Sequence, residues 1–154
     1  MKTYEEVIDF LFKQFPSYQQ KGGSAYKIGL DNIQAICNII GNPENKIKTI
    51  HIAGTNGKGS TCSILTKILI DHGLKVGLYT SPHLKKFNER IQINNCQISD
   101  EYIANFFNKN RAIINKIKAT FFETTTAMAF NYFKDQVVDY AIIETGLGGR
   151  LDST

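Results

Sequence analysis

The stretch His51-Ile-Ala-Gly-Thr-Asn-Gly-Lys-Gly-Ser-Thr61 decides the fold that we expect for this chain. Apolar residues over 49–53 predict a short strand, and the glycine-rich run after it leads into an amphipathic helix. The apolar positions of that helix are Ile64, Leu65, Ile68 and Leu69. A strand, a glycine-rich loop and a helix in this order can bind phosphate, because the glycines let backbone N–H groups face an anion at the positive helix terminus.

The loop departs from the common nucleotide-binding pattern G-x-x-x-x-G-K-[ST]. Ile52 stands where the upstream glycine belongs, and Gly59 separates Lys58 from the hydroxyl residues. A turn without a ligand is the alternative, but a lysine between two glycines has no packing purpose. Either Ser60 or Thr61 can offer a hydroxyl to a phosphate-bound magnesium ion. The residues expected to bind nucleotide are Gly54, Thr55, Asn56, Gly57, Lys58, Gly59, Ser60 and Thr61.

The order of the remaining elements predicts an α/β fold with a mostly parallel open sheet and flanking helices. Hydrophobic periodicity and turn residues predict strands at 49–53, 75–80 and 139–144, a hairpin at 89–98, and helices at 4–15, 31–40, 99–117 and 123–134. Asp31 and Ser99 are the expected N-caps, and 17–28 is expected to be a loop. Helix 4–15 presents Phe15 and other apolar residues to the core.

Right-handed crossovers place the carboxyl ends of parallel strands at one edge of the sheet, where ligands bind. The Lys58 loop, Ser81 and Glu144 each follow such a strand, so we expect them to meet. A carboxylate after an apolar strand suits Mg²⁺, whereas a helix cap or an ion pair is the alternative for Glu144. Ser81 is a metal ligand or a turn residue before Pro82.

Composition is that of an ordinary globular domain. The 154 residues are 42% hydrophobic and 21% charged, with a net charge of +4 and no dense Lys/Arg run, so we expect no nucleic-acid partner. No apolar stretch of about 18 residues occurs, so we expect no membrane span, and the first residues, Met-Lys-Thr-Tyr-Glu-Glu, lack the apolar core expected of a signal peptide. Three separated cysteines, Cys37, Cys62 and Cys96, are typical of reduced thiols in the cytoplasm.

Four motifs together resemble the folylpolyglutamate synthase and dihydrofolate synthase family, a branch of the amide-forming ligases that include the Mur enzymes. The segments are Gly54-Thr-Asn-Gly-Lys-Gly-Ser60, Tyr79-Thr-Ser-Pro-His-Leu84 with Phe87-Asn-Glu-Arg-Ile91, Thr120-Phe-Phe-Glu-Thr124, and Glu144-Thr-Gly-Leu-Gly-Gly-Arg-Leu-Asp-Ser-Thr154. They occur in the family's order and cover nearly the whole chain. Family members are more than twice as long, so the resemblance implies that 1–154 is the N-terminal part of the P-loop-type ATP-binding domain, without the C-terminal domain.

The resemblance implies a cytoplasmic enzyme, monomeric at full length, that uses ATP and Mg²⁺ to add L-glutamate to a folate or dihydropteroate carboxylate through an acyl phosphate. Lys58 and Glu144 would be catalytic. Ser60, Ser81 and Glu144 would hold metal. The implied substrate residues are His83, Arg90, Phe122, Glu123, Thr124, Arg150 and Asp152.

Structural roles remain open as alternatives for several of these side chains. Arg90 can pair with Glu89, Arg150 can pair with Asp152, and aromatic residues beside a helix start, such as Phe122, are commonly core. His83 is expected in an exposed loop, and His51, in a buried strand, is expected in the core. At the level of function, the alternatives are a simple ATP-binding or ATP-hydrolysing module and a non-catalytic truncated remnant.

Overall fold

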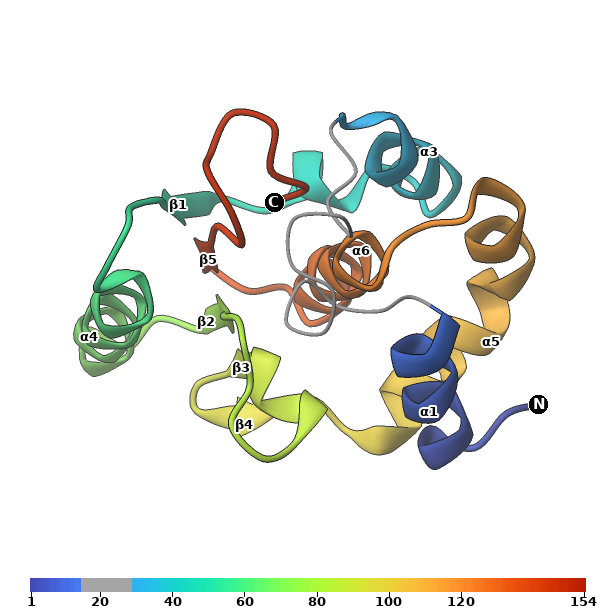
Figure 1. Cartoon of the computed structure of the whole chain (residues 1–154). Helices are drawn as coiled ribbons and strands as arrows, with labels where there is room; N and C mark the ends of the chain where they lie inside the picture. The colour runs from blue at the N-terminus through green and yellow to red at the C-terminus, as the bar shows by residue number, and fades with distance from the viewer. Residues whose placement is uncertain (15–28) are drawn as a thin grey trace.

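A five-stranded sheet forms the centre of the computed structural model, which describes residues 1–14 and 29–154 (Figure 1). The strand order is β1-β5-β2-β3-β4. Strands β1 (Thr49–Ile52), β5 (Tyr140–Glu144) and β2 (Val76–Tyr79) are parallel, and β3 (Ile91–Ile93) and β4 (Cys96–Gln97) continue the sheet in antiparallel pairing. The predicted α/β class with a parallel sheet centre and flanking helices is confirmed.

Helices cover both faces of the parallel strands (Figure 1). Helix α4 (Lys58–Asp71) packs on one face, and α6 (Phe121–Asp135) packs on the other with α3 (Asp31–Ile39), α1 (Tyr4–Gln14) and α5 (Asp100–Ile117) around it. Two short 3₁₀ helices lie at Pro43–Lys46 (η2) and Phe87–Arg90 (η3). The latter replaces the first half of the strand predicted from residue 89. Phe15 and the loop predicted at 17–28 lie outside the described residues.

Side-chain caps mark the starts of helices α5 and α6. Ser99 caps α5 as predicted, with its Oγ accepting a hydrogen bond from the Tyr102 N–H at 3.1 Å. Thr120 and Glu123 form a capping box at the start of α6. The predicted N-cap at Asp31 is wrong, because α3 begins at Asp31 itself and Leu30 occupies the cap position. The acidic side chain there lies in the first helical turn, where it complements the helix dipole.

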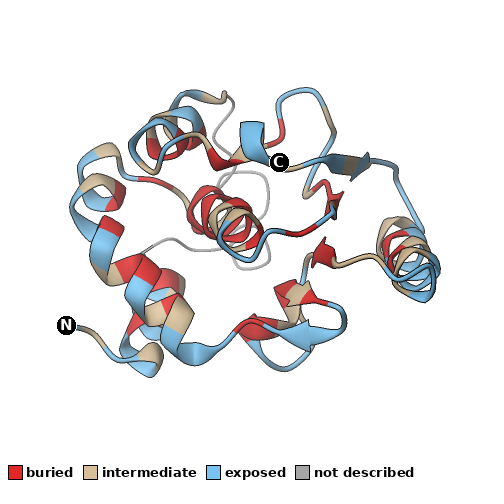
Figure 2. Cartoon of the chain, turned by 180° about the vertical axis from the view of Figure 1, so that it is seen from behind, coloured by how far each residue is buried: buried red, intermediate tan, exposed pale blue. Residues whose placement is uncertain are grey.

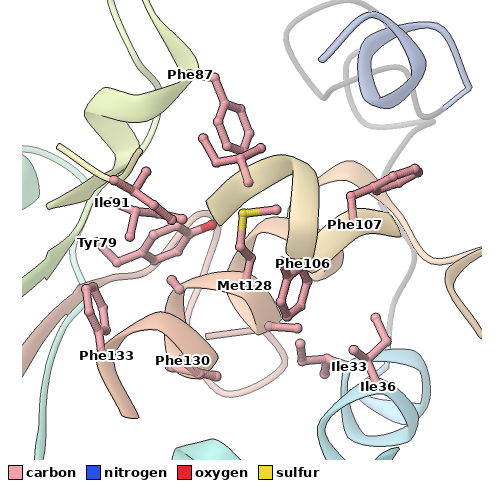
Figure 3. Close-up of a cluster of buried hydrophobic side chains, with 14 of the residues drawn as sticks. Ile33, Ile36, Tyr79, Phe87, Ile91, Phe106, Phe107, Met128, Phe130 and Phe133 are labelled. Carbon is pink, nitrogen blue, oxygen red and sulfur yellow. The ribbon is translucent and has the colours of Figure 1, made fainter. Parts of the chain in front are cut away.

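Helix α6 and strand β5 contain much of the buried surface (Figure 2). Side chains from α6, including Met128, Phe130 and Phe133, pack with Tyr79 of β2 and aromatic residues of α5 (Figure 3). A smaller cluster on the other face contains Cys62, Val76, Leu78 and Ile142 under α4. The central strand is thus covered from both sides, as its continuous apolar run predicted.

The predicted apolar face of α4 is partly wrong. Cys62 and Thr66 are buried against the sheet, but Ile64 and Ile68 are 63% and 48% exposed. The helix carries apolar residues around more than one face, so periodicity alone did not indicate which stripe meets the strands.

The prediction that His51 is a core residue is also wrong. In the described part of the chain β1 pairs with β5 alone, and its side chains alternate between exposed and half-buried. His51 is exposed, and its Nε2 lies 2.7 Å from the Thr154 hydroxyl. Burial of this side of β1 depends on which elements pack against it, and Thr49, His51 and Ala53 line a cavity there instead, which the sequence of the strand does not indicate.

Replacing Gly77 with alanine is expected to destabilise the fold. An added Cβ would lie 2.7–2.9 Å from three carbons of the Phe133 ring, which is itself fully buried. Overpacking of this kind costs about 1–3 kcal/mol of unfolding free energy, measurable by urea denaturation. Gly149→Ala is the matched control, because an added Cβ there meets nothing within 4 Å. Equal stability of the two variants would contradict the packing of α6 on β2.

Candidate active site

The loop after β1 presents a row of backbone donors at the start of α4. Gly57, with φ of +77°, turns the chain into the helix in the left-handed region that favours glycine. The N–H groups of Lys58, Gly59 and Ser60 lie in the first turn and make no backbone hydrogen bond within the described chain, whereas Thr61 N–H donates to the Gly57 carbonyl at 2.9 Å. These three donors at a helix N-terminus suit a phosphate group.

The lysine and hydroxyl side chains of the loop differ in whether they can still bind a ligand. Lys58 Nζ donates to the Gly54 carbonyl at 2.7 Å, which holds the ammonium across the loop and leaves two of its three donors for a ligand. The Thr61 hydroxyl donates to the Gly57 carbonyl at 2.9 Å. Ser60 is exposed, and its hydroxyl has no hydrogen bond to another described residue. Of the two hydroxyls, Ser60 is the one free to bind an ion.

Glu144 ends the central strand as a buried carboxylate. It is 5% exposed, and its Oε2 accepts a hydrogen bond from the Ser81 N–H at 2.9 Å. A Cβ added at Gly59 would lie 3.6 Å from Glu144 Oε1, so the carboxylate sits against the first turn of α4. No described lysine, arginine or histidine forms an ion pair with it. Among the described residues, Glu144 forms neither of the two alternatives, an ion pair or a helix cap.

The three strand ends therefore meet as expected, with Gly59, Ser81 and Glu144 in one place. Burial of the Cys62 thiol is the main reason that its pKa is raised to about 11, and the nearby charge of Glu144 is the second reason. A thiol with a raised pKa is a poor nucleophile, which argues against a catalytic role for Cys62. No group of three or more acidic, histidine or cysteine side chains gathers among the described residues. The donor set fits Mg²⁺, which takes one or two protein oxygens and shares the phosphates of its substrate.

The loop from 81 to 90 is held by Glu89. Its carboxylate accepts hydrogen bonds from the N–H groups of Leu84, Lys86 and Lys85 at 2.7, 2.9 and 3.1 Å. These bonds, first those of Leu84 and Lys86, lower the pKa of Glu89 below its ordinary value. The alternative that Glu89 pairs with Arg90 is wrong.

Lowering the pH is expected to release this loop. The pKa of Glu89 is lower in the folded chain than in the unfolded one. The three hydrogen bonds to its carboxylate are therefore fully formed above the ordinary glutamate pKa, and they are lost as the pH falls through the lowered pKa. The amide ¹H shifts of Leu84, Lys85 and Lys86 should move together with one midpoint below that of an ordinary glutamate. Glu89→Ala should remove the shared transition, and Glu101→Ala should not. Independent midpoints for the three amides would contradict a shared set of hydrogen bonds to the Glu89 carboxylate.

Arg90 is a buried guanidinium without an acidic partner in the described chain. It is 4% exposed, its Nε donates to His83 Nδ1 at 2.7 Å, and its Cζ lies 5.0 Å from the centre of the Phe121 ring. Burial lowers the pKa of Arg90, and nearby Tyr79 and Glu144 oppose that shift. His83 is half-buried, so the expectation of an exposed histidine is wrong. A guanidinium whose other N–H groups have no hydrogen-bond partner among residues 1–14 and 29–154 is suited to bind a carboxylate or phosphate.

The side chains at the start of α6 mainly make contacts that stabilise the fold. The Thr120 N–H and the Asn32 amide donate to Glu123 Oε2 at 2.6 and 3.2 Å, so this carboxylate caps the helix. Thr124 is fully buried, and its Oγ1 has no hydrogen-bond partner in the described chain. Phe122 is half-buried and lies against Gly146, where an added Cβ would come within 2.5 Å of the ring.

The loop after Glu144 is organised by Asp152. Its Oδ2 accepts from the Leu147 N–H at 2.7 Å, and its Oδ1 accepts from the Thr154 N–H and hydroxyl at 3.1 and 2.6 Å. Arg150 is exposed and forms no ion pair with Asp152, so that alternative is wrong. Both residues line a cavity of about 700 Å³ between α3, α6 and the outer face of β1, with Ile143 in its wall.

Comparison with known proteins reveals one group of relatives, although no family model matches the chain. A dihydrofolate synthase/folylpolyglutamate synthase of Bacillus subtilis is 43% identical over 135 residues, which cover 83% of this chain and 31% of that protein. The crystal structure of a folylpolyglutamate synthase from Thermotoga maritima has a TM-score of 0.86 and 41% identity, covering 97% of this chain and 34% of that one. A bifunctional folylpolyglutamate synthase/dihydrofolate synthase solved with Mn, AMPPNP and L-glutamate has a TM-score of 0.83 and 33% identity, covering 99% and 35%. The chain thus spans about a third of the length of these relatives.

Proposed function

We propose, because the chain belongs to the family of folylpolyglutamate and dihydrofolate synthases, that its loop-bearing sheet edge binds the phosphates of ATP in an amide-forming ligase. The ligase would join L-glutamate to the carboxylate of a folate or a dihydropteroate. The observation that carries the proposal is the buried Glu144 carboxylate beside the Ser81 amide and the first turn of α4. None of the helices in the described ranges is long and apolar enough to span a bilayer.

The chain's own groups would bind and align the phosphates. Lys58 would contact the transferred phosphoryl group, together with the N–H groups of Gly57 to Ser60 at the start of α4. Fixed donors of this kind require little rearrangement as charge develops during the transfer. Thr55 and Asn56 would complete the loop around the nucleotide.

Ser60, Ser81 and Glu144 would hold Mg²⁺. Bound there, the ion would neutralise charge on the phosphate oxygens. The fit rests on the exposed Ser60 hydroxyl and on a buried carboxylate that lacks a cationic partner in the described chain. The solved relative that has Mn and AMPPNP bound supports the use of a divalent ion and a nucleotide in this family.

The proposed reaction has two steps. A carboxylate oxygen of the acceptor attacks the γ-phosphorus of ATP, ADP leaves, and an acyl phosphate forms. The amine nitrogen of L-glutamate then attacks the acyl carbon, loses a proton, and inorganic phosphate leaves. Arg90, oriented by His83, and the exposed Arg150 are the cationic side chains that we propose for acidic ends of the substrates. Phe122 is the aromatic side chain that we propose to contact the acceptor ring.

The test is an assay of ADP formation with and without L-glutamate, using dihydropteroate and tetrahydrofolate as alternative acceptors. The proposal predicts sustained ADP formation, beyond one equivalent per chain, only when an acceptor and L-glutamate are both present. ATP turnover without glutamate would favour a simple nucleotide hydrolase. No turnover and no nucleotide binding would favour a non-catalytic chain.

A further inference from the structure

Phe12, in the last turn of α1, contacts both of the side chains that hold Arg90. Its ring centre lies 5.9 Å from that of His83 in an edge-on arrangement, and 5.1 Å from that of Phe121 in a tilted one. His83 accepts the hydrogen bond of Arg90 Nε, and Phe121 lies beneath the guanidinium. Within the described chain, the ring contacts of Phe12 are with the two side chains that touch the guanidinium, so we expect Phe12 to act on Arg90 through these two rings.

The two rings that support Arg90 come from separate segments. His83 belongs to the loop that Glu89 holds by backbone hydrogen bonds, and Phe121 is the first residue of α6. Phe87 also packs on both rings, with centre distances of 6.4 and 5.8 Å, but it lies in the same loop region as His83. Among the ring contacts of the described residues, those of Phe12 join this group to the N-terminal helix.

The N-terminal helix is itself anchored to the body of the chain. The Tyr4 hydroxyl donates to Asn88 Oδ1 at 2.6 Å, and Asn88 in turn donates to the Ile98 carbonyl and Asp100. Lys2 exchanges two hydrogen bonds with the Asn108 side chain. A helix fixed at these points can present Phe12 to the rings at a constant position.

We infer that Phe12 is a positioning residue for Arg90: it packs against His83 and Phe121 and so fixes the direction of the guanidinium. Helix α1 thereby belongs to the substrate site and not only to the core. The consequence for ligation rests on the proposed function, in which Arg90 binds an acidic end of a substrate. The placement of Arg90 within the chain does not rest on it.

The test measures solvent exchange of the Arg90 Nε–H by NMR of the ¹⁵N-labelled chain. Phe12→Leu removes the ring but keeps an apolar side chain, and it should speed exchange by about tenfold, as expected when one hydrogen bond is weakened. Phe12→Met should do the same and serves if the leucine variant folds poorly. Phe12→Tyr keeps the ring and should exchange like the wild type. Phe10→Leu removes a ring that packs on Phe107 instead, at 5.1 Å, and should leave Arg90 exchange unchanged.

Two results would overturn the inference: unchanged Arg90 exchange in the folded Phe12→Leu and Phe12→Met variants, or equal acceleration in Phe10→Leu. In the ligation assay, Phe12→Leu should raise the KM of the substrate that Arg90 binds by about tenfold, with kcat changed less. If the wild-type chain shows no ligation, the proposed function fails, but the exchange measurement still decides the role of Phe12.

Discussion

Lys58→Ala is expected to lower kcat/KM for glutamate-dependent ADP formation by about 10²–10³-fold or more, the effect of removing a fixed group that stabilises developing charge. The side chain lies at the start of α4, held over the loop by the Gly54 carbonyl, and it is the cation of the loop. Alanine keeps the helix and removes the charge, so the loss should appear in catalysis and in nucleotide affinity with little change in stability.

The matched control is Lys67→Ala on the same helix. Lys67 forms an exposed ion pair with Asp71 one turn away, and such pairs contribute little. Its activity should remain near that of the wild type. Ligation by Lys58→Ala at the rate of the Lys67 control would refute the assignment of the loop as a phosphate-binding site.

Glu144→Gln is expected to remove ligation together with its magnesium dependence, and to stabilise the metal-free chain. A buried charge that accepts one hydrogen bond and has no described cationic partner costs free energy in the folded state. The neutral amide keeps the shape and can still accept from Ser81, so the unfolding free energy in EDTA should rise by about 1 kcal/mol. Added Mg²⁺ should stabilise the wild type and not the variant.

Urea denaturation with and without Mg²⁺ measures both effects. Glu101→Gln, an exposed change at the start of α5, should alter stability by less than about 0.5 kcal/mol and keep the response to Mg²⁺. A Glu144→Gln variant that stays active with the wild-type magnesium response would exclude the carboxylate as a metal ligand.

Features with a local cause were predictable from the sequence. The glycine-rich loop at Lys58, the Ser99 cap and the apolar run that ends in Glu144 each act through neighbouring residues, and the structure has them as expected. The meeting of Ser81 with Glu144 follows from strand topology, since parallel strands end at one edge.

Features that depend on tertiary neighbours were not predictable. His51 was expected in the core because its strand is apolar, but burial of that face depends on what lies beside β1. The bond between His83 and Arg90 joins residues seven apart in an irregular loop, where no periodicity gives a signal. The sequence predicts Phe12 only as one of several core residues of a helix. Its contacts with His83 and Phe121 appear only in three dimensions.

The most direct test of the phosphate-binding edge is the unfolding midpoint of the chain titrated with ATP and Mg²⁺. A ligand that binds the folded chain stabilises it by about 2.7 kcal/mol at 100 times its dissociation constant. The unfolding midpoint should rise for the wild type, rise less for Glu144→Gln, and stay unchanged for Lys58→Ala. An equal rise in all three proteins would contradict a phosphate-binding edge, because the nucleotide would then bind without the Lys58 loop and the Glu144 carboxylate.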